Sequence, residues 1–262
     1  MSMKGKLKCV RFVERLTSLP DGVTVEKSDY VPLYAEWIRP ESAEKDKVIL
    51  YFHGGGPVMG NAKSRRSIVA NFVKMTGYQA LLFDYRPAAE HPAPSAVKDS
   101  ADIYRWMLDQ GYRPEDIVFV GDSAGGGIEI GTLLKLKDDR IPMPAACVAF
   151  SPSLDMTMSG ESTHPYTSPL LGNLDGLPPI MIHVGNDEVL RDDSTRFGEK
   201  ADAAGVNIHV KVWKGMSHCF PLLNPLFEEA TEAMKQVTVF IRQNIQKDRR
   251  LAASLLYLML YL

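Results

Sequence analysis

The stretch Val118–Gly127, VFVGDSAGGG, places one serine among four glycines at the end of an apolar run. The apolar residues before Gly121 predict a short buried strand, and those after Ser123 predict a helix. Glycine has no Cβ, so Gly121 and Gly125 allow a turn too sharp for other residues. The pattern G-x-S-x-G therefore predicts a strand–turn–helix that pushes the Ser123 hydroxyl out at the end of a sheet. A glycine-rich turn without chemistry would have the same letters, and this stretch alone leaves both interpretations open.

Apolar runs and segments of helical period alternate along the rest of the chain. The expected strands are 23–28, 33–39, 48–52, 79–83, 117–120, 145–150, 179–184 and 208–213. The expected helices are 64–75, 95–110, 124–136, 190–204 and 224–246. Because the later strands are apolar throughout and are separated by helices, we expect an α/β fold, with a mostly parallel central sheet and helices on both faces. The first two strands, joined by a short turn, should pair antiparallel at one edge.

The composition is that of an ordinary globular protein. Of its 262 residues, 45% are hydrophobic and 24% charged, and no repeat or boundary divides it, so we expect a single domain over residues 1–262. A formal net charge of −2 gives no indication of nucleic acid or an anionic membrane as a partner. The cysteines, Cys9, Cys147 and Cys219, are widely spaced, as is typical of a reducing compartment. The first residues lack an apolar core of signal-peptide length, so we expect a cytoplasmic protein.

Nothing in the sequence predicts a cofactor or a metal ion. No two of the six histidines stand at ligand spacing on a helix, and no two cysteines lie two residues apart. Residues 55–60 are similar to a phosphate-binding loop, but Asn61 stands where that loop requires lysine. We therefore expect no cofactor and no metal site.

A serine, an acid and a histidine follow three of the expected strands, in the order Ser123, Asp187, His218. Ligands bind at the C-terminal ends of the strands in open parallel sheets, and this order is that of α/β-hydrolases. A serine hydroxyl attacks only when a base takes its proton, and a carboxylate fixes the tautomer of that histidine. Asp192 and Asp193 could compete with Asp187, but they fall inside an expected helix and rank below it.

A tetrahedral oxyanion needs preorganised hydrogen-bond donors. The glycines after the strand 48–52 let the chain approach closely, so the backbone N–H groups of Gly55 and Gly56 can supply two donors. The N–H of Ala124, at the start of the helix that follows Ser123, can supply a third. Cys219, beside His218, could be a rival nucleophile, but it lacks the sharp turn and is better explained as a small core residue.

Six motifs stand in one order along the chain, and together they resemble the hormone-sensitive-lipase family of carboxylesterases over roughly residues 23 to 246. They are HGGG at 53–56, DYRPAAEHP at 84–92, GDSAGG at 121–126, SP at 151–152, DEVLRD at 187–192 and GMSH at 215–218. The resemblance implies an α/β-hydrolase fold and hydrolysis of esters through an acyl-enzyme. It also implies Ser123, Asp187 and His218 as the catalytic triad. The implied oxyanion hole comprises Gly55, Gly56 and Ala124.

The sequence departs from the family pattern near the expected pocket. Pro57 replaces a residue that is usually aromatic, and Glu129 replaces a small or apolar one, so Glu129 should be strained or meet a basic partner. A block of about two helices is missing between residues 160–162 and 168–170, and the N-terminal extension is short. We therefore expect a reduced or absent cap, with residues 1–22 as its N-terminal remnant. Because the lost segments remove pocket walls, short acyl chains, from acetate to about hexanoate, should be preferred.

Residues 251–262 form an apolar C-terminal tail after the basic run KDRR at 247–250. Twelve residues are too few to span a bilayer as a helix, which needs about 20. The tail could be an appended stretch without a role, a segment on a membrane surface, or a cover for apolar surface on its own domain or on a second copy, giving a homodimer. A membrane is the least favoured partner, because the tail lacks a polar face.

Three functions compete at this point. The first is a serine carboxylesterase that hydrolyses small-molecule esters with short acyl chains. The second is a non-catalytic ligand-binding protein of the same fold, although such proteins typically lose a triad member and none is lost here. The third is a membrane-associated lipase, suggested by the apolar tail.

Overall fold

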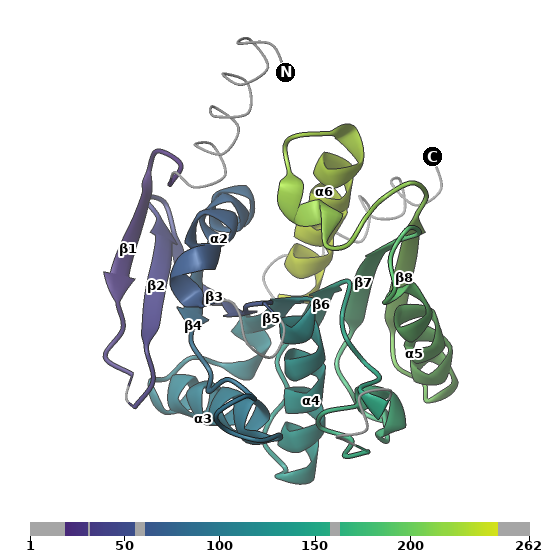
Figure 1. Ribbon diagram of the computed structural model, residues 1–262. Coiled ribbons are helices and arrows are strands. Elements are labelled where there is room, and N and C mark those ends of the chain that lie inside the picture. Colours follow the sequence, from purple (N-terminus) through teal and green to yellow (C-terminus); the bar gives the residue numbers. More distant parts are fainter. Residues whose placement is uncertain (1–18, 31, 56–60, 158–162, 246–262) are drawn as a thin grey trace.

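The computed structural model describes residues 19–30, 32–55, 61–157 and 163–245, and its centre is one eight-stranded sheet (Figure 1). The order of the strands is β1-β2-β4-β3-β5-β6-β7-β8. Their bounds are β1 Val23–Lys27, β2 Ala35–Pro40, β3 Glu44–Phe52, β4 Tyr78–Phe83, β5 Ile117–Asp122, β6 Ala146–Phe150, β7 Ile180–Gly185 and β8 Ile208–Trp213. Strands β3 to β8 run parallel, whereas β1 and β2 are antiparallel at one edge.

Among the residues that the structure describes, five α-helices cover the two faces of this sheet, as the alternating pattern predicts. Their bounds are α2 Ala62–Thr76, α3 Ser95–Asp109, α4 Ala124–Asp138, α5 Arg191–Ala203 and α6 Glu228–Asn244. Helices α2 and α6 pack on one face of the sheet, and α3, α4 and α5 on the other (Figure 1). Successive residues of each strand face opposite sides, so Leu50 belongs to one core and its neighbours Ile49 and Tyr51 to the other. The expected mostly parallel sheet with helices on both faces is confirmed.

Two boundaries differ by four residues from the sequence expectations, each for a physical reason. Strand β3 begins at Glu44, in a stretch expected to be a charged loop, because Lys47 is buried against Asp116 and its charge is thereby compensated. Helix α6 begins at Glu228, four residues later than expected. The preceding segment, which contains Pro221 and Pro225, instead forms the short 3₁₀ helix η4, Phe220–Leu223, and a turn.

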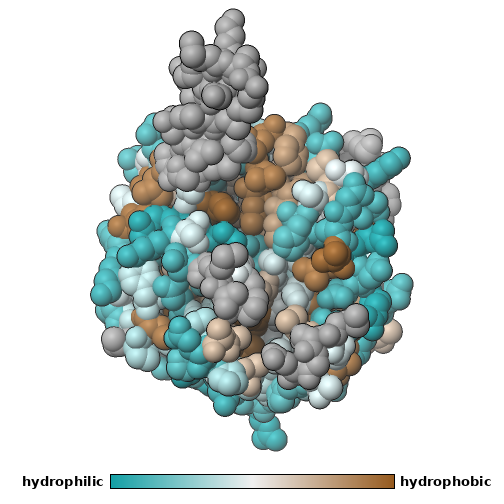
Figure 2. Space-filling model, viewed as in Figure 1, coloured by the Kyte–Doolittle hydropathy of each residue, from teal (hydrophilic) through white to brown (hydrophobic). Residues whose placement is uncertain are grey.

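Some expectations concern residues outside the described part of the chain. These are the cap remnant, apart from its last four residues, the tail 251–262, and residues 158–162 of the shortened connection between β6 and β7. The described part of that connection has two 3₁₀ elements, at Thr157 and at η3, Pro169–Leu171, and no α-helix. None of the helices in the described part of the chain has both the length and the apolar composition to cross a bilayer. Figure 2 shows apolar side chains gathered on the surface between α2 and α6, above the ends of the strands.

Candidate active site

Ser123 occupies the turn between β5 and α4, as the sequence pattern predicts. Its backbone has φ 54° and ψ −120°, a conformation that costs a non-glycine residue about 1–3 kcal/mol. The neighbouring glycines are sterically required. A Cβ on Gly125 would lie 2.2 Å from the carbonyl oxygen of Phe52, and one on Gly121 would lie 2.9 Å from the backbone of Gly125. The strain and the close packing together hold Ser123 at the N-terminus of α4.

His218 links Ser123 to a carboxylate. Its Nε2 lies 2.9 Å from the Ser123 Oγ, and its Nδ1 lies 2.8 Å from the Oε2 of Glu188. An ionised carboxylate can only accept a hydrogen bond, so Nδ1 carries the ring proton and Nε2 accepts the hydroxyl proton of Ser123. Glu188 is well shielded, with 2% of its side chain exposed. The three residues therefore form a serine–histidine–carboxylate chain at the ends of β5, β8 and β7.

The carboxylate that contacts His218 belongs to Glu188, whereas the sequence led us to expect that of Asp187. The backbone N–H of Asp187 donates to the carbonyl of Met216 at 3.1 Å, and its exposed carboxylate accepts from Asn186 at 3.0 Å. Glu188 comes one residue later, and its longer side chain folds back, with Oε1 accepting the Gly185 N–H at 3.2 Å. The fixed backbone of Asp187 thus turns its side chain away from His218.

The two rival acids lie elsewhere. Asp192 pairs with the adjacent Arg191 on the surface, and Asp193 accepts backbone N–H groups of Leu154 and Asp155. Neither of these carboxylates contacts His218. The signal in the sequence was a run of four acidic residues within seven positions, and chain order alone could not rank them.

Two of the three expected oxyanion donors, Ala124 and Gly55, lie in the described part of the chain. Ala124 is the first residue of α4, where the unpaired N–H groups of the helix favour negative charge. Gly55 follows β3 with φ 141°, a backbone conformation that favours glycine. Gly56 lies outside the described residues.

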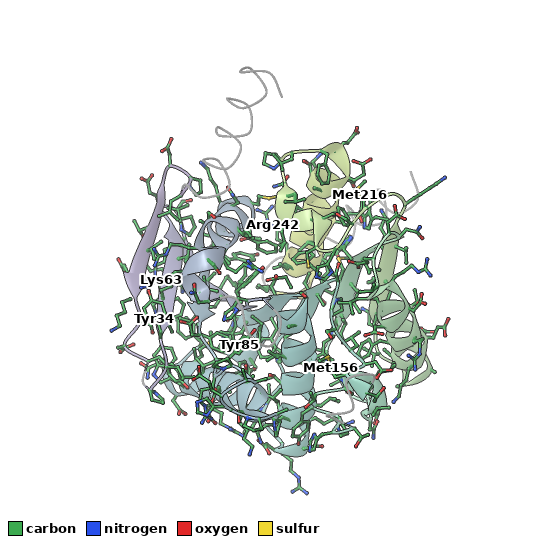
Figure 3. The ribbon with its side chains drawn as sticks, in the orientation of Figure 1. Tyr34, Lys63, Tyr85, Met156, Met216 and Arg242 are labelled. Carbon is green, nitrogen blue, oxygen red and sulfur yellow. The ribbon has the colours of Figure 1, made fainter. Side chains whose placement is uncertain are left out.

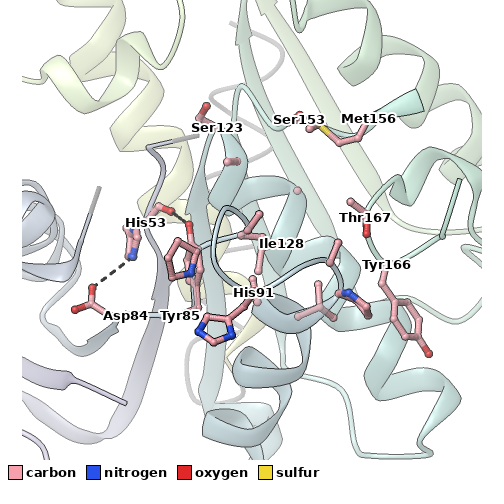
Figure 4. Close-up of a pocket in the computed structure, with 18 of the residues that line it drawn as sticks. His53, Asp84, Tyr85, His91, Ser123, Ile128, Ser153, Met156, Tyr166 and Thr167 are labelled. Atoms are coloured by element: carbon pink, nitrogen blue, oxygen red, sulfur yellow. Dashed lines mark hydrogen bonds and ion pairs between the residues drawn. The ribbon is translucent and has the colours of Figure 1, made fainter. Parts of the chain in front are cut away.

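A pocket of about 500 Å³ opens beside Ser123 (Figure 4). Tyr85, after β4, and Met156, after β6, both line it (Figure 3) and lie on different sides of the view into the pocket (Figure 4). Its apolar wall includes Ile128 of α4 and Val97 of α3. A volume of this size is ordinary for a small-molecule site. The described part of the connection between β6 and β7 thus contributes walls to the pocket.

The other side of the pocket is polar. The Nε2 of His53 lies 3.5 Å from the Oδ1 of Asp84, and the ring of His53 stacks on that of Tyr85. Burial alone would raise the pKa of Asp84, but the neighbouring His53 ring and a hydrogen bond from the Ala62 N–H lower it below the usual value. Asp84 is therefore an ionised group in the pocket lining.

Helix α4 also packs closely against the segment that follows β6. A Cβ on Gly127 would lie 2.1 Å from the carbonyl oxygen of Ser153, so only glycine allows this approach. Ser153 and Met156 both line the pocket. Ser123 and part of the pocket wall are consequently held by the same helix.

Two further residues singled out in the sequence lie close to the site. The Sγ of Cys219 is 3.5 Å from the Nε2 of His218, but burial raises the pKa of the thiol well above its usual value, which opposes a role as a nucleophile. Glu129 is fully buried and forms no ion pair with a described basic side chain. The expected basic partner is therefore not found in the described part of the chain. Burial raises the pKa of Glu129 well above its usual value, and nearby Cys147 and Gly121 offset only part of this effect.

Comparison with known proteins agrees with this geometry. Residues 49–163 and 157–222 match the family described as having the alpha/beta hydrolase fold. An esterase of Acinetobacter venetianus is 33% identical over 228 residues, covering 76% of this chain and 75% of the relative. An acetyl-hydrolase of Streptomyces hygroscopicus is 32% identical over 237 residues, covering 79% of each chain. A crystal structure of an esterase from the bacterial hormone-sensitive lipase family superposes with a TM-score of 0.84 at 32% identity, covering 94% of this chain and 93% of that one.

The chain belongs to the α/β-hydrolase family that it matches. Within that family it is a carboxylic ester hydrolase of the hormone-sensitive-lipase type.

Proposed function

We propose that this protein hydrolyses short-chain acyl esters through an acyl-enzyme, with Ser123 as nucleophile, His218 as base and Glu188 as the group that orients His218. The observation that carries the proposal is the pair of contacts of His218, 2.9 Å to Ser123 and 2.8 Å to Glu188. A base between a hydroxyl and a carboxylate is the arrangement that activates a serine.

The first half-reaction acylates Ser123. The Nε2 of His218 takes the hydroxyl proton while Oγ bonds to the ester carbonyl carbon, and the charge forms on the carbonyl oxygen. The N–H groups of Gly55, Gly56 and Ala124 stabilise this oxyanion. The tetrahedral intermediate then collapses, the bond to the alcohol oxygen breaks, and His218 returns the proton to the leaving alcohol.

The second half-reaction releases the acid. His218 takes a proton from water, the hydroxide oxygen bonds to the acyl carbon, and the bond to Ser123 breaks as His218 reprotonates Oγ. Glu188 stabilises the imidazolium in both steps without taking the proton.

The pocket supports a preference for short acyl chains. Each buried CH₂ contributes about 0.8 kcal/mol only where apolar walls surround it. Here the apolar wall around Ile128 and Val97 faces the ionised Asp84, so a long chain would have to desolvate this carboxylate. The name of the Streptomyces relative, an acetyl-hydrolase, points the same way.

A fluorophosphonate probe tests the mechanism. It should add once per chain, at Ser123, and the Ser123→Ala variant should lose both labelling and ester turnover. Adding p-nitrophenyl esters of increasing acyl length to the unmodified protein measures the chain preference. Absence of labelling and turnover in the unmodified protein would instead favour a non-catalytic ligand-binding protein.

A further inference from the structure

Asp122, the residue before Ser123, holds a buried carboxylate that the proposed reaction does not use. Only 1% of its side chain is exposed. Its Oδ1 accepts hydrogen bonds from the N–H of Gly54 and the hydroxyl of Tyr51, both at 2.9 Å. Its Oδ2 accepts from the Nη2 of Arg65 at 3.1 Å. The carboxylate thus joins the end of β5 to the end of β3 and to the first turn of α2.

The contact with Gly54 places Asp122 directly against the oxyanion turn. A Cβ on Gly54 would lie 2.2 Å from the Oδ2 of Asp122, so the turn is packed onto this carboxylate. Gly54 immediately precedes Gly55 and Gly56, the proposed oxyanion donors, and Asp122 immediately precedes Ser123. One hydrogen bond therefore fixes where the donors begin relative to the nucleophile.

The far end of the same segment is fixed independently. The N–H of Ala62, the first residue of α2, donates to the Oδ1 of Asp84 at 2.6 Å. His53, at the near end of the segment, lies against the same oxygen atom. His53 after β3 and Ala62 at the start of α2 therefore both lie against Asp84, and Arg65 in the first turn of α2 reaches back to Asp122.

Arg65 supplies the positive charge that this buried carboxylate requires. Burial would lower the pKa of the Arg65 guanidinium, but Asp122 raises it, so the group remains charged. The Nε of Arg65 is buried and has no hydrogen-bond partner within the described part of the chain. The guanidinium of Arg65 is therefore oriented so that Nη2 donates to Asp122, although this leaves Nε without a hydrogen bond.

We propose that Arg65 is a positioning residue of the oxyanion hole, acting through Asp122 on the turn that begins at Gly54. This inference rests on the proposed ester hydrolysis at Ser123. Without the guanidinium, Asp122 lacks its counter-charge and no longer holds the donors at their distance from Ser123. Misplacement of transition-state donors lowers kcat more than it raises KM, because the oxyanion exists only in the transition state.

The test compares Arg65→Met with Arg66→Met. Arg66 is the next residue of α2, and its guanidinium pairs with the buried Glu36 of β2, away from the oxyanion turn. Both variants remove one arginine that pairs with a buried carboxylate. We expect Arg65→Met to lower kcat by about 10- to 100-fold with little change in KM, and Arg66→Met to keep the unmodified kcat.

A trifluoromethyl ketone gives a readout that a purely structural role would not move. It forms an oxyanion on Ser123, so its Ki should rise in Arg65→Met by the same factor by which kcat/KM falls. Arg65→Lys should recover part of both losses, since it restores the charge. If Arg65→Met does not fold, Tyr51→Phe removes one donor to Asp122 and should show smaller changes in the same direction.

The inference is overturned if Arg65→Met keeps the unmodified kcat, if Arg66→Met loses as much, or if kcat falls while the inhibitor binds as before. The failure of the proposed function has a different signature. In that case the unmodified protein would show neither turnover nor fluorophosphonate labelling at Ser123.

Discussion

Two carboxyl groups are buried on the strand–helix unit that carries Ser123, and their surroundings differ completely. Asp122, at the end of β5, accepts hydrogen bonds from three donors, one of them a guanidinium. Glu129, in the second turn of α4, has only the Cys147 thiol and the Gly121 backbone beside its carboxyl, and its oxygens form no hydrogen bond of normal geometry within the described part of the chain. Both are almost fully inaccessible to water. Burial alone therefore does not decide whether a carboxyl group stabilises or destabilises the fold. Its hydrogen-bond and ion-pair partners decide whether it is charged and how much free energy its burial costs.

The two groups also lie on opposite faces of the sheet. Asp122 points toward α2 and the oxyanion turn, where the reaction geometry must be fixed. Glu129 lies under α4 beside Cys147 and Gly121, where nothing in the proposed reaction depends on it. Substitutions of Asp122 and of Glu129 should therefore change the free energy of unfolding in opposite directions.

The largest expected effect concerns a third shielded carboxylate, Glu188. Glu188→Gln should lower kcat by about 10³- to 10⁴-fold, because the amide no longer fixes the tautomer of His218 or stabilises its charge. Asp187→Asn is the matched control and should leave kcat almost unchanged. Steady-state kinetics with a short p-nitrophenyl ester compare the two variants. A larger loss in Asp187→Asn would return the acid to the position that the sequence first suggested.

Among these substitutions, removal of the hydrogen-bonded Asp122 carboxylate should have the largest effect on the free energy of unfolding. Asp122→Ala leaves Arg65 and the N–H of Gly54 without their partner, and it should lower the free energy of unfolding by about 3 kcal/mol. Urea denaturation at neutral pH measures the change. An unaltered midpoint would show that water replaces the carboxylate at no cost.

Removal of the unsatisfied carboxyl should have the opposite sign. Glu129→Met replaces an unpaired buried polar group by an apolar side chain of similar size, and it should raise the free energy of unfolding by about 1–2 kcal/mol. Ile130→Met, at the next position of α4, is the control for packing and should cost less than about 1.5 kcal/mol. Destabilisation by Glu129→Met beyond that control would reveal a partner of the carboxyl that remains to be found.

The smallest expected effect is a change in pH dependence. The pKa of Glu129 is raised in the folded state, so the folded protein binds its proton more tightly than the unfolded chain does. The resulting contribution to stability is fully present below the unfolded pKa, near 4.5, and is lost as pH rises through the folded pKa. The stability gained by Glu129→Gln over the unmodified protein should therefore be greater at pH 8 than at pH 5. Urea midpoints at the two values measure this, and equal gains would argue that Glu129 is ionised in the fold.

The sequence predicted those features of the site that require a particular residue type for steric reasons. Gly121 and Gly125 each have a backbone atom where a Cβ would stand, so the turn at Ser123 could be recognised from the letters alone. The partner of His218 left no such trace, because Asp187 and Glu188 are adjacent acids, and the course of the loop decides which of them reaches His218. Lys47 shows a similar limit, since its pairing with Asp116 depends on a contact between residues far apart in the chain. The Asp122 network was missed for the same reason: its four members come from three separate elements and a turn.

The close contact between Gly127 and the carbonyl of Ser153, in the segment after β6, has a consequence for selectivity among acyl-chain lengths. Ser123 begins α4, and Ser153, which borders the pocket, rests on the same helix one turn later. Ser123 and this part of the wall are therefore attached to one helix. We expect the distance between them, and with it the length of an acyl chain that fits against Ser153, to change little when the contacts between α4 and its neighbours loosen.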